Sequence, residues 1–97
     1  MSIKGLVAKY VTNAEQVLRE LAVIEDSTGI SPEDAKNVVE YARAYLDDAK
    51  YYKDKGKLTV SLTSVAYCEG LLDALKLLGA VKFEWPTKTS TRSERRS

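Results

Sequence analysis

The chain of 97 residues contains no histidine, which removes the most common metal ligand and the usual general base near neutral pH. Cys68 is the single cysteine, so the chain can form neither an internal disulfide nor a cysteine-based metal cluster. No glycine-rich phosphate loop or nucleophile elbow is present. Carboxylate-bridged di-metal bundles are excluded as well, because they use Glu-x-x-His pairs. The sequence therefore predicts no cofactor, no metal site and no enzymatic activity.

Long apolar runs are also missing. The N-terminal residues lack the apolar run of a signal peptide, and no stretch approaches the roughly 20 apolar residues of a membrane span. We therefore expect a soluble, cytoplasmic protein. With 44% hydrophobic residues, a chain of this length can bury a single core without metal or disulfide staples.

Charge divides the chain into two parts. Residues 1–85 carry 11 Lys and Arg against 13 Asp and Glu, whereas residues 86–97 carry four basic residues against one acidic residue. The second part has no apolar content to hold it in place, so the sequence predicts one domain over 1–85 and a disordered basic tail over 86–97. The basic residues of the tail are candidates for contacts with nucleic-acid phosphates: Lys88, Arg92, Arg95 and Arg96.

Apolar residues recur at three- and four-residue steps in three segments, which predicts helices near residues 3–25, 32–55 and 58–79. Ser31 and Pro32 form a strong start signal for the second helix, because Ser31 can cap the first turn and Pro32 needs no N–H there. Gly56 and Gly79 are placed to end the second and third helices in the left-handed conformation.

The third helix is the most apolar, with apolar side chains over about half of its circumference, and we expect it to be the most buried. Cys68 lies in this apolar arc and is expected to act as a small buried hydrophobe. The charged residues Glu69, Asp73 and Lys76 lie on the remaining side. We predict a structural role for this polar stripe, and the alternative is a carboxylate pair that binds a cation or acts as acid and base.

After Gly79, Val81, Phe83 and Trp85 alternate with Lys82 and Glu84, which indicates extended structure. Since the rest of the sequence offers no strand to pair with it, this segment is expected to lie as a strap along the bundle. Three long helices with short connections predict an all-α, up-down-up antiparallel three-helix bundle with a short extended C-terminal strap.

Residues Tyr41 to Val81 resemble the archaeal domain-of-unknown-function family numbered 357. The similarity lies in the helix YARAYLDDAKYYKDKG, in the cap at Gly56, and in the string from Tyr67 to Ala74 that leads to Leu78-Gly79. The resemblance implies a small all-helical bundle and an archaeal cytoplasmic protein. It implies no catalytic residue, and Cys68 stands where a small residue such as alanine is expected.

A short bundle with six tyrosines, one tryptophan and a widely apolar third helix has more apolar surface than two neighbouring helices cover. We therefore predict a non-catalytic interaction module whose partner is another protein chain, with a homodimer as one form. The candidate partner-binding residues are Tyr51, Phe83 and Trp85. Two alternatives stay open, namely nucleic-acid binding through the basic tail and a carboxylate-based, metal-dependent enzyme.

Overall fold

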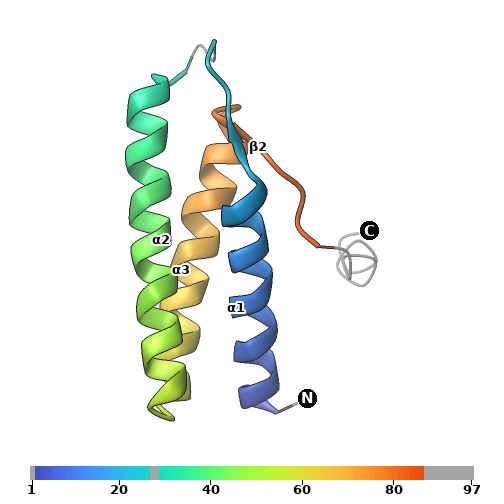
Figure 1. Cartoon of the computed structure of the whole chain (residues 1–97), viewed down its shortest axis with the longest axis vertical. Coiled ribbons are helices and arrows are strands. Elements are labelled where there is room, and N and C mark those ends of the chain that lie inside the picture. Colours follow the sequence, from blue (N-terminus) through green and yellow to red (C-terminus); the bar gives the residue numbers. More distant parts are fainter. Residues whose placement is uncertain (1, 27–28, 87–97) are drawn as a thin grey trace.

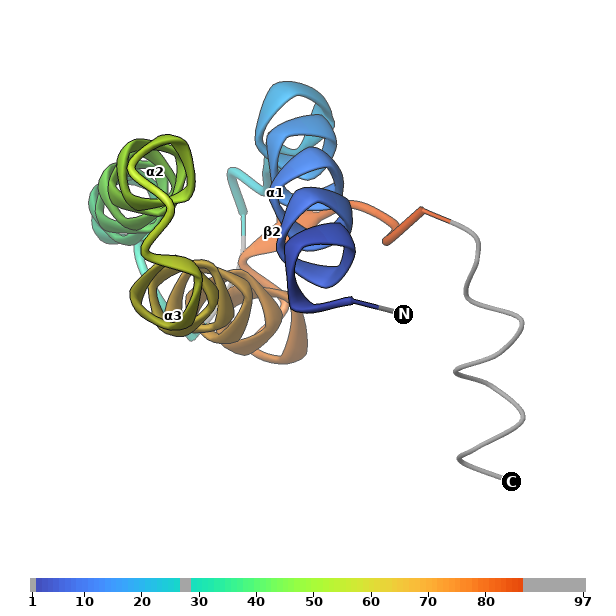
Figure 2. The same cartoon turned by 90° about the horizontal axis from the view of Figure 1, so that it is seen from below.

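The computed structural model describes residues 2–26 and 29–86 and contains, within them, three helices and one short pair of strands. The helices are α1 (Ile3–Glu20), α2 (Pro32–Asp54) and α3 (Leu58–Leu77), and the strands are β1 (Ala22–Val23) and β2 (Val81–Lys82). The helices run up, down and up (Figure 1), and they form a triangle when viewed along their axes (Figure 2). The prediction of an all-α three-helix bundle is confirmed.

Local capping fixes the ends of α2 and the end of α3 as the sequence predicts. The hydroxyl of Ser31 accepts a hydrogen bond from the backbone N–H of Asp34 at 3.0 Å. Gly56 and Gly79 adopt φ values of 78° and 74°, which only glycine adopts without strain. Each glycine donates its N–H to a carbonyl three residues earlier, so the last carbonyls of both helices find partners.

The core lies between the three helices and beneath the C-terminal strap. Its most completely buried large side chains are Val7, Val17, Val65, Cys68, Leu72 and Leu75. Ser61 is the one buried polar residue among the described residues, and its hydroxyl donates to the carbonyl oxygen of Ala49 at 2.6 Å. This hydrogen bond connects the start of α3 to the end of α2. The burial of Ser61 is indicated in the sequence only by its helical spacing from Val65 and Cys68.

The first helix is shorter than expected, because α1 ends at Glu20 and not near residue 25. The next residues become extended, and Ala22 and Val23 pair antiparallel with Lys82 and Val81. The backbone N–H of Ile24 continues the pairing to the carbonyl of Ala80 at 2.9 Å. The expectation that the strap has no strand to pair with is therefore wrong. Backbone groups of both segments gain partners in this arrangement, and β-branched residues favour the extended conformation.

The expectation that α3 is the most buried helix is also wrong. Five residues are buried in each of α1, α2 and α3, although α3 is much the most apolar of them. Val60, Tyr67 and Leu78 belong to the apolar arc and are nevertheless exposed, as is Leu77 outside the arc. Two neighbouring helices cover only part of the circumference of a third, so the width of the apolar arc exceeds what the bundle can bury.

Replacing Leu72 by Ala should lower the free energy of unfolding by about 2 to 5 kcal/mol, because this fully buried side chain would leave a cavity. The matched control is Leu77→Ala on the same helix, where the side chain is 87% exposed and the change should stay within about 0.5 kcal/mol. Leu71 is only half-buried, so its replacement by Ala should fall between the two. Urea denaturation followed by circular dichroism at low protein concentration measures all three, and equal losses for Leu72 and Leu77 would contradict the packing.

Candidate functional site

The outer face of α3 carries no charged residue. Its exposed positions, together with the cap residue that follows the helix, are Thr59, Val60, Thr63, Ala66, Tyr67, Gly70, Ala74, Leu77 and Leu78. They recur at three- and four-residue steps along the whole helix, so they form one continuous strip. We call this strip the uncharged face of α3.

The other two helices show a different composition on their solvent sides. Charged residues occupy four of the eight exposed positions of α1 and eight of the twelve exposed positions of α2. The charged residues of α3, which are Glu69, Asp73 and Lys76, all lie on the flank of the helix and are half-buried. The uncharged face is therefore a particular property of α3 and does not follow from a low charge of the whole chain.

Aromatic side chains extend the uncharged face onto α2. The rings of Tyr45 and Tyr67 meet edge to face, with centroids 4.4 Å apart. Tyr41 lies one turn before Tyr45 on α2 and is 65% exposed. Tyr41 and Tyr67 thus make the seam between α2 and α3 part of the same surface.

The C-terminal strap holds two residues of the polar stripe. The indole N–H of Trp85 donates to a carboxylate oxygen of Asp73 at 2.7 Å. The ammonium group of Lys76 lies 3.7 Å from a carboxylate oxygen of Glu84 and 4.9 Å from the centroid of the Phe83 ring. These contacts give Asp73 and Lys76 a part in fixing the segment after β2 against α3.

The three candidate partner-binding residues do not share one surface. Phe83 is only 8% exposed and packs in the core of its own chain, so it is not available to a partner. Trp85 is half-buried and packs edge to face against Phe83. Tyr51 is 56% exposed on α2, and the segment after β2 lies on the far side of α1 and α3 from that helix (Figures 1 and 2). The strap thus covers the core of its own chain, and Phe83 and Trp85 take part in packing within the chain.

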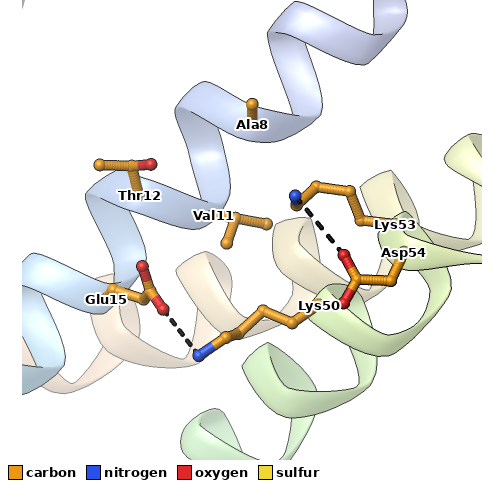
Figure 3. A pocket seen from close by; sticks show the side chains of 7 residues that line it. All are labelled: Ala8, Val11, Thr12, Glu15, Lys50, Lys53 and Asp54. Atoms are coloured by element: carbon orange, nitrogen blue, oxygen red, sulfur yellow. Dashed lines mark ion pairs between the residues drawn. The ribbon is translucent and has the colours of Figure 1, made fainter.

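A shallow pocket lies between α1 and α2 (Figure 3). Its charged side chains form ion pairs. The ammonium nitrogen of Lys50 lies 2.6 Å from a carboxylate oxygen of Glu15, and that of Lys53 lies 3.8 Å from a carboxylate oxygen of Asp54. The hydrogen bond to Glu15 raises the pKa of Lys50, which keeps this amine protonated and unsuited to proton transfer at neutral pH. The pocket volume of about 190 Å³ is below the roughly 300 to 1,000 Å³ of small-molecule sites. The pocket is therefore a poor candidate for a ligand site.

Cys68 is fully buried in α3. Burial raises the pKa of its thiol to about 12, and the nearby carboxylate of Glu69 adds to the shift. A thiol that stays protonated is a poor nucleophile and a poor metal ligand. The expectation that Cys68 acts as a small buried hydrophobe is confirmed by this burial.

No group of three or more Cys, Asp or Glu side chains suited to a metal ion occurs among the described residues. The basic candidates of the tail, which are Lys88, Arg92, Arg95 and Arg96, lie outside the described residues, as does the tail predicted to be disordered beyond Pro86. The surface best suited to a function in the described part of the chain is therefore the uncharged face of α3.

A sequence model of a family described as "Protein of unknown function (DUF357)" matches residues 9–81. The matched region includes most of α1, all of α2 and α3, and the first residue of β2. No curated protein and no solved structure gives a significant match.

Replacing Trp85 by Phe should lower the free energy of unfolding by about 1 to 2 kcal/mol, because the carboxylate of Asp73 loses a charge-assisted hydrogen bond at a half-buried site. Asp73→Asn provides the second arm of a double-mutant cycle, and the two effects should be less than additive. Thermal unfolding followed by circular dichroism measures both variants. Strict additivity would show that the two side chains do not interact.

Cys68 should resist alkylation by iodoacetamide in the folded protein and react rapidly in urea, because the folded thiol is buried and protonated. The unfolded thiol has a pKa near 8.5. The thiol therefore loses its proton at a lower pH in the unfolded state than in the folded state. The free energy of unfolding should fall as the pH rises from about 8.5 towards 12. Cys68→Ala is the control and should lack this component of the pH dependence. Rapid labelling of the folded protein at neutral pH would contradict the burial.

Proposed function

The chain belongs to the DUF357 family, and from its surface we propose that it acts as a non-catalytic helical module that binds another protein chain. The observation that supports the proposal is the uncharged face of α3, which runs the length of a helix in a protein with 30% charged residues. An exposed surface that is uncharged and largely apolar usually marks an interface on a small domain.

The exposed apolar side chains give this face a reason to bind. Leu77 and Leu78 are 87% and 58% exposed, and Tyr67 and Val60 continue the apolar surface along the helix. Full burial of a side chain such as leucine contributes about 1.5 to 3 kcal/mol relative to its exposed state. A partner that covers the face therefore gains a substantial hydrophobic contribution. The polar groups of the face are hydroxyl groups, so a partner has to leave hydrogen-bond partners only for these.

We also propose that the protein is cytoplasmic. Contrary to the expectation that no stretch approaches a membrane span, α3 is apolar enough to cross a membrane by length and composition alone. Its inner side, however, packs into the bundle core, and its flank carries Glu69, Asp73 and Lys76, of which Asp73 and Lys76 contact the strap. These contacts support a helix that remains in the bundle and offers one side to a partner.

The proposal predicts that a photo-crosslinking amino acid at Leu77, introduced into the full chain in cells of the native host, forms covalent adducts with protein. The matched control places the same amino acid at Lys36, an exposed position on α2 that lies among charged residues. Mass spectrometry of the purified adducts identifies the attached chain. Adducts at Leu77 and few at Lys36 support the proposal, whereas equal yields, or no protein adduct at Leu77, overturn it.

A further inference from the structure

We infer that the occupant of the uncharged face is a second copy of this chain, packed antiparallel across a two-fold axis at Gly70. This inference rests on the proposed function and names its partner. In this arrangement, residues equally far before and after Gly70 face each other across the axis. Ala66 of one copy lies opposite Ala74 of the other, and Thr63 lies opposite Leu77.

Gly70 is an exposed glycine within α3, on the uncharged face. A glycine within a helix lowers stability by roughly 0.5 to 1 kcal/mol relative to alanine. Within the chain this glycine has no packing role, because a Cβ atom added at Gly70 would meet no atom within 4 Å. A glycine with open space in front of it on an exposed helix face is explained when another backbone approaches there from outside.

The neighbours of Gly70 fit the same close approach. Ala66 and Ala74 lie one turn away on either side, so the middle of the uncharged face presents three small residues in line. Small residues at this spacing allow two helices to pack with their backbones close together. Towards the ends of the helix the residues become larger, and Leu77 of one copy fills the space beside Thr63 of the other.

Charge complementarity favours a second copy over a charged partner. A partner with charged side chains would have to remove them from water against a face that offers no counter-charge, which is unfavourable. A second copy brings an equally uncharged face of the same length. A two-fold arrangement also joins identical patches and closes after two copies.

The available area is consistent with a small, reversible dimer. A helix of 20 residues is about 30 Å long, and the face widens to two helices, roughly 20 Å, where Tyr41 extends it onto α2. One helix width, roughly 10 Å, gives about 300 Å² for each copy and two widths give about 600 Å², so the total lies at about 600 to 1,200 Å², in the range of weak and transient contacts. The charged residues of α2 then form the rim of the interface.

Sedimentation equilibrium of the full chain over a wide concentration range should show a monomer and dimer in equilibrium. Gly70→Leu should weaken the dimer at least about tenfold by separating the two backbones, while it should stabilise the monomer because leucine favours helix more than glycine does. Leu77→Lys should weaken the dimer as well. Thr12→Leu, on an exposed position of α1, is the control and should leave the dissociation constant within about twofold.

Disulfide formation tests the orientation of the two copies in a Cys68→Ala background. Gly70→Cys should cross-link to itself, because position 70 lies on the axis. Thr63→Cys should not cross-link to itself but should do so when mixed with Leu77→Cys, since these positions face each other only in the antiparallel arrangement. Self-linking of Thr63→Cys in place of the mixed product would overturn the antiparallel arrangement.

A chain that stays monomeric at every concentration would overturn the inference, and so would a monomer that binds phosphatidylcholine vesicles through Leu77. The proposed function is tested separately by the photo-crosslinking experiment. Adducts at Leu77 with a different protein, together with a monomeric chain, would leave the interaction module standing and exclude the second copy as its partner.

Discussion

The structure depends on one geometric constraint, which is that a helix in a three-helix bundle has only two helical neighbours. The apolar arc of α3 covers about half of its circumference, yet its only fully buried members are Val65, Cys68, Leu72 and Leu75, which lie beside the buried polar residue Ser61. These residues point towards the shared core, and the neighbouring helices cover no more than this inner sector and its flanks. The remaining apolar residues of α3 have to face outwards.

The C-terminal strap relieves this constraint on one flank of α3. Its backbone pairs with β1, its Phe83 side chain enters the core, and Trp85 reaches Asp73. The strap therefore uses the polar stripe of α3 for contacts within the chain. The outer face of the helix, which lies opposite the core and next to this flank, receives no such cover, and it is also the side without charge.

The described part of the molecule presents few side chains suited to catalysis or ligand binding. The thiol of Cys68 is buried and protonated, and the ionic side chains of the pocket between α1 and α2 pair with each other. What distinguishes the surface is the contrast between the charged outer sides of α1 and α2 and the uncharged outer side of α3. For this reason the proposed activity is binding, and the helix that contributes much to the core also provides the binding surface.

The sequence by itself determined the local structure. Periodicity gave three helices, Ser31 and Pro32 marked the start of α2, and Gly56 and Gly79 marked the ends of α2 and α3, because capping depends on residues close together in the chain. The lack of histidine, which is a property of composition, excludes histidine-based metal and acid–base chemistry whatever the fold. The uncharged face of α3 was not identified from the sequence, because on a helical wheel Thr63 and Gly70 lie beside the charged residues, and only the structure shows which of these positions are exposed.

Only the tertiary structure decided which part of that arc is buried. A helical wheel gives the angle between two residues but not the directions in which neighbouring helices lie, so it places Tyr67 and Leu72 in the same apolar arc, although Tyr67 is exposed and Leu72 is buried. The end of α1 was decided in the same way. The residues after Glu20 fit a helical and an extended pattern equally well, and their pairing with β2, almost 60 residues further along the chain, selects the strand.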